Sequence, residues 1–98
     1  RKHRVLILGD MLELGEWSLS EHGTIIRQAA RDPEAELILV GGEFARAYAA
    51  LPEKPARVTL CPSCEELRHL LQTAPVDDAL VLVKGSHGIG LEKILDLL

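Results

Sequence analysis

The stretch VLILGD, Val5 to Asp10, places four consecutive aliphatic residues before a glycine and an acid. Three further short apolar runs follow along the chain: residues 37–40 (LILV), 58–60 (VTL) and 80–83 (LVLV). A strand with one face in water alternates polar and apolar residues, whereas an unbroken apolar run indicates burial on both faces. The four runs therefore predict parallel strands that are covered by helices.

Helical stretches separate these runs. Apolar residues recur at helical spacing in residues 19–31, an alanine-rich stretch spans residues 43–51, another amphipathic stretch starts after residue 63, and residues 91–98 carry a last apolar stripe. The order β-α-β-α-β-α-β-α predicts a Rossmann-like, three-layer α/β domain with a four-stranded, mainly parallel sheet and helices on both faces. The preferred strand order is 3-2-1-4, and the flavodoxin-like order 2-1-3-4 is the alternative.

Two serine–glutamate pairs predict helix starts. Ser18 with Glu21, and Ser63 with Glu66, have the three-residue spacing of a capping box. The second pair overlaps a C-x-x-C sequence at residues 61–64. We interpret that sequence as a helix start rather than a redox or zinc pair, because further Cys or His partners at suitable spacing are not found.

Length and charge narrow the class of protein. The chain has 98 residues, enough for one domain, and a formal net charge of −4 without a basic stripe. These features argue against a nucleic-acid binder. We find neither an apolar run that could cross a bilayer nor a recognisable signal peptide, so we expect a cytoplasmic protein. Because the chain starts at Arg1 and reaches its first apolar run at once, we expect it to be part of something longer.

The loop after the fourth apolar run is rich in glycine and contains a lysine. Residues 84–90 read KGSHGIG, but Lys84 precedes the glycines, which excludes a Walker A loop. The glycine spacing also fails the dinucleotide fingerprint G-x-G-x-x-G. Two interpretations remain: an anion site at the start of the last helix, with Lys84 and Ser86 contributing, or a flexible turn with a solvated lysine.

The loop after the first apolar run is long, from Gly9 to His22. Asp10 and Glu13 are candidate ligand contacts, but Asp10 capping the turn and Glu13 facing solvent are equally compatible with the sequence. Because ligands bind beyond the carboxyl ends of parallel strands where the winding reverses, the order 3-2-1-4 places Asp10 and Lys84 at one crevice. His22 lies on an apolar helical stripe, which predicts a packed histidine rather than a ligand.

The two loops together resemble the MurF branch of the Mur ligase family. GDMLELGEWSLSEH resembles the family stretch G-D-M-x-E-L-G followed by Ser and His, LVKGSHGIGLEKI resembles K-G-S-R-x-x-x-M-E, and VGGEF resembles the end of the second strand of the family's C-terminal domain. The sequence departs from the pattern at His87, where the family has arginine, and at Leu91, where it has methionine. Whether His87 replaces that arginine functionally is open.

The resemblance implies an ATP-dependent amide ligase of peptidoglycan synthesis, which joins D-alanyl-D-alanine to UDP-N-acetylmuramoyl-tripeptide through an acyl phosphate. Residues 1–98 resemble its third, C-terminal domain without the N-terminal part of that domain, including the D-x-Y-N-A-N-P element. The resemblance implies that the third domain closes over ATP, that the first, N-terminal domain holds the UDP-sugar, and that ATP and Mg are bound mainly by the absent domains, with the P-loop and the magnesium ligands in the central one. The isolated chain is therefore expected to lack a cofactor and ligase activity.

Carried over by motif, the predicted substrate and nucleotide cleft comprises Asp10, Met11, Glu13, Lys84, Gly85, Ser86 and His87. The sequence predicts neither a catalytic acid or base nor a metal ligand. Without the earlier part of the domain, an edge or a face of the sheet is expected to be uncovered, so monomer and dimer both stay open. A stand-alone Rossmann-like module that binds a phosphorylated small molecule is the alternative function.

Overall fold

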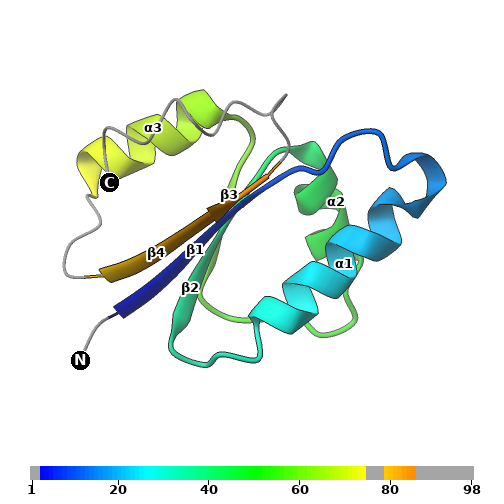
Figure 1. Ribbon diagram of the computed structural model, residues 1–98, viewed down its shortest axis with the longest axis horizontal. Coiled ribbons are helices and arrows are strands. Elements are labelled where there is room, and N and C mark those ends of the chain that lie inside the picture. Colours follow the sequence, from blue (N-terminus) through cyan, green and yellow to red (C-terminus); the bar gives the residue numbers. More distant parts are fainter. Residues whose placement is uncertain (1–2, 75–78, 86–98) are drawn as a thin grey trace.

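The computed structural model describes residues 3–74 and 79–85 of the chain. Strands and helices alternate in the predicted order (Figure 1). The elements are β1 (His3–Gly9), the 3₁₀ turn η1 (Gly15–Trp17), α1 (Ser18–Ala29), β2 (Ala35–Val40), α2 (Gly42–Ala50), β3 (Val58–Cys61), α3 (Cys64–Thr73) and β4 (Ala79–Lys84). The helix predicted at residues 91–98 lies outside the described residues, as do Ser86 and His87.

The four strands form one parallel sheet in the order β3-β2-β1-β4. In this register Leu6 of β1 lies opposite Leu37 of β2 on one side and Leu82 of β4 on the other. The predicted order 3-2-1-4 is confirmed, and the alternative order 2-1-3-4 is wrong. The winding reverses at β1, because β2 and β3 are added on one side of it and the connection through α3 returns to the other side.

Helices cover the two faces of the sheet, with α1 and α2 on one face and α3 on the other (Figure 1). Successive side chains of a strand point to opposite faces. Val5 and Ile7 of β1 accordingly pack with Leu67 of α3, whereas Leu8 packs with Ile26 of α1. Because β1 is buried on both sides, its apolar run is unbroken.

The strand β3 departs from the expectation of burial on both faces. Thr59 and Leu60 are exposed, and only Cys61 at its end is buried. β3 is an outer strand of the sheet and pairs only with β2. An outer strand is covered less completely than a central one, which accounts for the exposure of a short apolar run.

The predicted capping boxes have different outcomes. Ser63 is the N-cap of α3, and its side chain accepts a hydrogen bond from the Glu66 backbone N–H at 3.4 Å, which confirms the predicted helix start and the serine half of the box. The prediction for Ser18 and Glu21 is wrong. The helix α1 begins at Ser18 itself, with Trp17 at the N-cap position and without a side-chain cap bond. The 3₁₀ turn η1 ends at Trp17, directly before α1. Ser18 is therefore inside the helix, and its hydroxyl bonds a partner other than the helix N-terminus.

The second outer strand, β4, leaves part of the sheet open. Val81 and Val83 pack toward the α3 side, so Leu82 and Lys84 point to the face of α1 and α2. On that face Leu82 is 50% exposed. Within the described residues, this part of the sheet beside α1 is open, and the expected loss of an N-terminal part of the domain stays a prediction. Among residues 3–74 and 79–85, no helix has the length and apolar character needed to traverse a lipid bilayer.

Candidate functional site

Asp10 follows β1 directly and caps the N-terminus of α2. Its carboxylate accepts hydrogen bonds from the backbone N–H groups of Glu43, at 3.0 Å, and Phe44, at 2.9 Å. The first N–H groups of a helix lack partners within the helix, and a negative charge at this end is favourable. Asp10 is only 5% exposed. Its side chain thus braces the loop after β1 against α2, a helix that begins 32 residues later.

Gly41 makes room for this carboxylate. It is the N-cap residue of α2 and has φ 110° and ψ 167°, a conformation that is nearly exclusive to glycine. A Cβ atom built on Gly41 would lie 2.2 Å from one carboxylate oxygen of Asp10. Glycine is therefore needed at this position of the VGGEF sequence, since any side chain at Gly41 would displace the Asp10 carboxylate that caps α2.

His22 fixes the next residue of the loop. The backbone N–H of Met11 donates to Nε2 of His22 at 3.0 Å, so Nε2 carries no proton. In the neutral ring the proton is then on Nδ1, which lies 2.7 Å from the backbone oxygen of Ser18 and donates to it. The ring is fully buried and meets Phe44 edge-to-face at 4.5 Å between centroids. The prediction of a packed histidine is confirmed.

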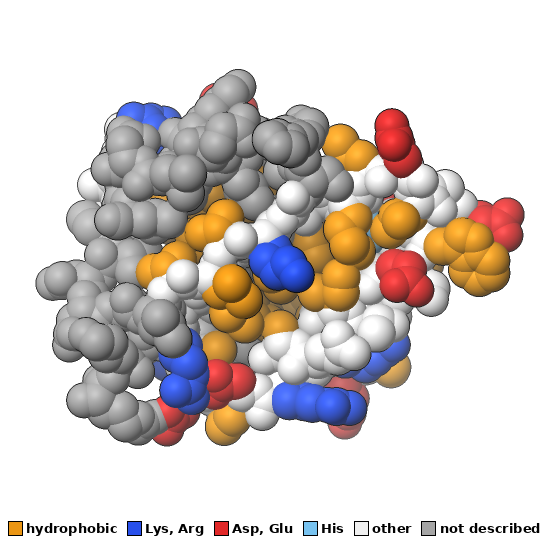
Figure 2. Space-filling model, in the orientation of Figure 1, with side chains coloured by type: hydrophobic (Ala, Val, Ile, Leu, Met, Phe, Trp, Pro, Cys, Tyr) orange, Lys and Arg blue, Asp and Glu red, His pale blue; other side chains and the backbone are white. Residues whose placement is uncertain are grey.

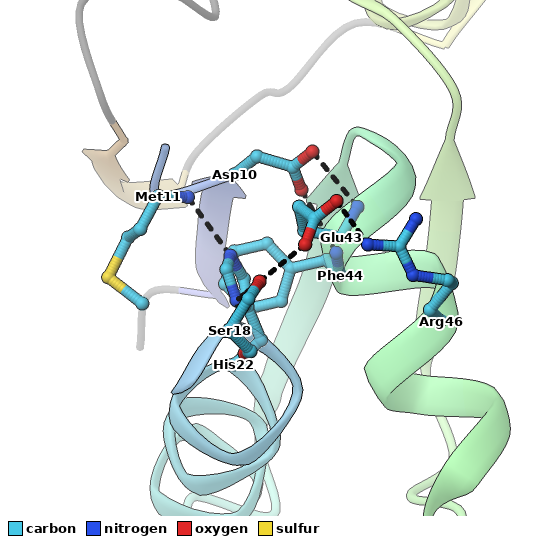
Figure 3. A network of polar contacts seen from close by, with 7 residues as sticks. All are labelled: Asp10, Met11, Ser18, His22, Glu43, Phe44 and Arg46. Carbon is cyan, nitrogen blue, oxygen red and sulfur yellow. Dashed lines mark hydrogen bonds and ion pairs between the residues drawn. The ribbon is translucent and has the colours of Figure 1, made fainter. Parts of the chain in front are cut away.

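Ser18 and Glu43 link the starts of α1 and α2, as Figure 3 shows. The Ser18 hydroxyl donates to one carboxylate oxygen of Glu43, and the guanidinium of Arg46 donates to the other. These contacts hold the pKa of Glu43 below its ordinary value, through the Ser18 hydrogen bond first and the Arg46 contact second. The polar network thus joins the ends of three elements, β1, α1 and α2, at one corner of the domain.

A groove of about 510 Å³ lies on the open part of the sheet beside α1. Most of its lining is apolar, and one lysine stands at its end. The lining residues are Leu6, Leu8, Gly9, Met11, Ile25, Gln28, Ala29, Phe44, Leu82, Lys84 and Gly85. Volume and apolar lining match those of ligand sites in proteins.

Lys84 stands at the carboxyl end of β4, opposite Leu8 of β1 in the parallel register. Asp10 comes two residues after Leu8, so both loops begin at one edge of the sheet, as the strand order predicts. Lys84 is exposed, and its ammonium group makes no ion pair with any residue in the described ranges 3–74 and 79–85. A cationic group in the lining of an apolar groove is suited to an anion that has an apolar portion.

The predicted cleft residues do not all share one surface. Met11, Lys84 and Gly85 line the groove, whereas the Asp10 carboxylate is turned toward α2. Glu13 lines a second pocket of about 250 Å³, which Met11 also borders. Ser86 and His87 fall outside the described residues.

Sequence reasoning missed Glu43 and the role of Gly41. Glu43 takes part in the network with its backbone N–H, which donates to Asp10, and with its carboxylate, which accepts from Ser18. The available signal was the pair of glycines before Glu43, since a glycine pair between a strand and a helix often marks a close backbone approach. It did not reveal which side chain approaches.

The paired cysteines are structural in this arrangement. Cys61 and Cys64 are both buried and form no disulfide. Burial raises the pKa of the Cys61 thiol, and the nearby Glu66 adds to this effect. Since the thiolate is the reactive form, Cys61 is poorly suited to redox chemistry or metal binding.

Comparison with known proteins gives one relationship. The chain is 33% identical over 100 aligned residues to UDP-N-acetylmuramoyl-tripeptide–D-alanyl-D-alanine ligase of Mycobacterium leprae. The alignment covers 94% of this chain but only 19% of the ligase. No protein-family profile matches the chain, and no solved structure does. The relationship points to Mur-type ligases and concerns a small portion of such an enzyme.

Proposed function

We propose that the chain is the C-terminal domain of a MurF-type ligase, an ATP-dependent enzyme that joins D-alanyl-D-alanine to UDP-N-acetylmuramoyl-tripeptide. The supporting observation is the pairing of β1 with β4, which starts the GDM and KGS loops at one edge of the sheet. Both loops belong to a chain that aligns over 94% of its length with part of such a ligase. The proposed location of the enzyme is the cytoplasm.

In this proposal the domain closes over ATP and helps to position the amine substrate. Lys84 contacts an anionic group of the nucleotide or of the substrate, and Met11 and Gly85 shape the groove next to it. Asp10 and His22 do not touch the ligands. They hold the loop after β1 in place, Asp10 through the backbone of α2 and His22 through the N–H of Met11.

ATP and Mg belong, in this proposal, to the other domains of the enzyme, which supply the phosphoryl-transfer chemistry. Within the ranges 3–74 and 79–85, the structure contains no group of three or more His, Cys, Asp or Glu side chains placed to hold a metal ion. The Asp10 carboxylate, at the edge of the sheet, is occupied by two backbone N–H groups. We propose a positioning role for this chain.

The test uses the full-length product of the gene that encodes this chain. Lys84→Ala is expected to lower kcat/KM for ligation about tenfold to hundredfold, because a charge-assisted hydrogen bond contributes about 1.5–3 kcal/mol. The thermal midpoint should stay within about a degree of wild type, because surface substitutions away from structural contacts rarely change stability by more than about 0.5 kcal/mol. Lys54→Ala is the matched control, since within the described residues the Lys54 ammonium bonds the Leu51 carbonyl at the far end of α2, away from the groove. Wild-type turnover in Lys84→Ala would show that Lys84 is merely solvated.

A stand-alone module that binds a phosphorylated small molecule is the second candidate, and the groove with Lys84 at its end favours it. Titration of the 98-residue chain with nucleotides and sugar phosphates separates the two functions. Tight binding supports the module, whereas the ligase domain is expected to bind them weakly without its neighbours. Finding a P-loop and a D-x-Y-N-A-N-P element upstream in the same gene supports the ligase.

A further inference from the structure

The connection between β1 and α1 ends in an exposed apolar projection. Trp17 is 64% exposed, and Leu19 and Leu12 are 50% and 43% exposed. We call these three residues, together with the neighbouring Glu13, Glu16 and Glu21, the loop tip. A tryptophan offers a large apolar surface with one polar group and little conformational freedom to lose, and tryptophan is enriched among the residues that dominate binding at protein interfaces.

Two contacts hold the loop tip in place. Just before it, the Met11 N–H is bonded to His22, and between Trp17 and Leu19 the Ser18 hydroxyl is bonded to Glu43. Between these anchors Glu13 has φ 68°, a left-handed conformation that is unfavourable for a residue other than glycine. Strained residues of this kind concentrate at binding surfaces, and a pre-formed projection loses less entropy when it docks.

The segment of sequence that carries the loop tip is acidic, and the positive Arg46 beyond it is paired with Glu43. From Val5 to Ile26 the sequence contains four acids and neither lysine nor arginine. One of the four, Asp10, is buried in the cap of α2, whereas Glu13, Glu16 and Glu21 are exposed. Figure 2 shows the corresponding end of the molecule, where red and orange side chains are gathered around the projecting loop. An acidic rim around apolar anchors selects a partner with a basic rim, because complementary charges orient the two surfaces.

The loop tip also continues the surface of the groove. Met11 lines the groove that contains Lys84, and it also lines the pocket of about 250 Å³ to which Leu12 and Glu13 of the loop tip belong. Because Met11 borders both surfaces, a protein domain that covers the groove at the edge of the sheet would also contact the loop tip. This continuity favours one occupant for both surfaces.

We propose that the loop tip docks, with Trp17 as its anchor, onto a basic and partly apolar surface of another domain of the same polypeptide. This inference rests on the proposed ligase function, since that function supplies the neighbouring domains. Docking fixes the orientation of this domain relative to its neighbour, with the groove and Lys84 facing the ligands.

The test follows Trp17 by fluorine NMR in the full-length protein, labelled with 5-fluorotryptophan. The signal of Trp17 is the one that disappears in Trp17→Phe. Its solvent isotope shift between H₂O and D₂O is measured without ligand and with Mg²⁺ and a non-hydrolysable ATP analogue. We expect the shift to fall below half of that of free 5-fluorotryptophan in at least one of the two states. A shift in both states at or above the fraction that the 64% exposure of Trp17 in the undocked domain gives would overturn the proposal.

A charge experiment tests whether the acidic side chains of the loop tip are needed for Trp17 to be covered by another domain. Glu16→Gln combined with Glu21→Gln should weaken docking and so return the isotope shift of Trp17 at low salt most of the way to its value in an undocked domain. The reason is that complementary charge orients the two surfaces. The matched control, Glu53→Gln with Glu65→Gln, changes the same net charge at exposed positions on other elements and should leave the shift unchanged. Equal shifts in the two double variants would overturn the charge complementarity on which the proposal depends.

Ligase turnover, measured on the same preparations, distinguishes the two proposals. Turnover with an exposed Trp17 would refute docking and leave the ligase function standing. A covered Trp17 in a protein that does not ligate would refute the ligase function and leave an interface between domains of another activity.

Discussion

Replacing Gly41 with alanine tests the corner where Asp10 caps α2. Two separate costs are expected. The backbone of Gly41, at φ 110° and ψ 167°, is unfavourable for any residue with a Cβ atom. The new Cβ atom would also lie 2.2 Å from an Asp10 carboxylate oxygen, a distance that forces the carboxylate to move. Its two hydrogen bonds to the N–H groups of Glu43 and Phe44 are then lost.

The magnitude follows from these two costs. Strain of a non-glycine residue in a region reserved for glycine is about 1–3 kcal/mol. Loss of a helix N-cap is about 0.5–2 kcal/mol. Gly41→Ala is therefore expected to lower the free energy of unfolding by about 4 kcal/mol, taking the middle to upper part of both ranges because the cap is buried. Asp10→Ala removes only the cap and should cost about 2 kcal/mol.

The assay is urea unfolding of the 98-residue chain, followed by far-ultraviolet circular dichroism. Gly42→Ala is the matched control, because a Cβ atom on Gly42 meets nothing within 4 Å and the residue begins a helix, where alanine is preferred. It should be neutral or stabilising by up to about 1 kcal/mol.

A double-mutant cycle tests whether a Cβ atom at position 41 and the Asp10 carboxylate clash. Once Asp10→Ala has removed the carboxylate, Gly41→Ala should cost only its backbone strain. The double variant is then expected to lose about 4 kcal/mol rather than the additive value of about 6 kcal/mol. Additive losses, or a loss below about 1 kcal/mol for Gly41→Ala alone, would refute the reasoning.

Three further outcomes are expected. Ser63→Ala should lower the free energy of unfolding of the chain by about 1 kcal/mol through loss of the α3 cap, and an unchanged urea midpoint would contradict that role. The pKa of Glu43 lies below its ordinary value, mainly through the Ser18 hydrogen bond, so its stabilisation is present above that ordinary value and is lost as pH falls through the folded-state pKa. Glu43→Gln should therefore flatten the acid-side decline of the thermal midpoint, whereas parallel pH profiles would count against the contact. Nitrogen-15 NMR at neutral pH should show His22 protonated on Nδ1, and a proton on Nε2 instead would be incompatible with the Met11 hydrogen bond.

Much of the fold could be predicted from the sequence, because its determinants are local. Unbroken aliphatic runs such as LILV at residues 37–40 indicate strands that are buried on both faces. Ser63 could be identified as a cap because its partner, Glu66, is only three residues away. The strand order was not decided by the sequence, because the right-handed crossover rule allows both 3-2-1-4 and 2-1-3-4, and the structure selects the first.

The candidate site was predicted less completely, because its contacts join distant parts of the chain. Asp10 could be placed at the end of β1, but its partners are the amides of Glu43 and Phe44 on α2. Ser18 has the spacing of a capping residue, yet its hydroxyl donates to Glu43 on another helix. Local spacing cannot reveal which of two competing partners a hydroxyl selects.

The sequence by itself determined the alternation of strands and helices and the placement of both polar loops after strand ends, since both depend on periodicity and on neighbours a few residues apart. Only the tertiary structure decided which side chains of these loops face the groove and which brace the corner between α1 and α2. Met11 and Lys84 line the groove, whereas Asp10 turns inward. The physical reason is that the amides at the N-terminus of α2 lack partners of their own, and folding brings them within reach of the nearest carboxylate.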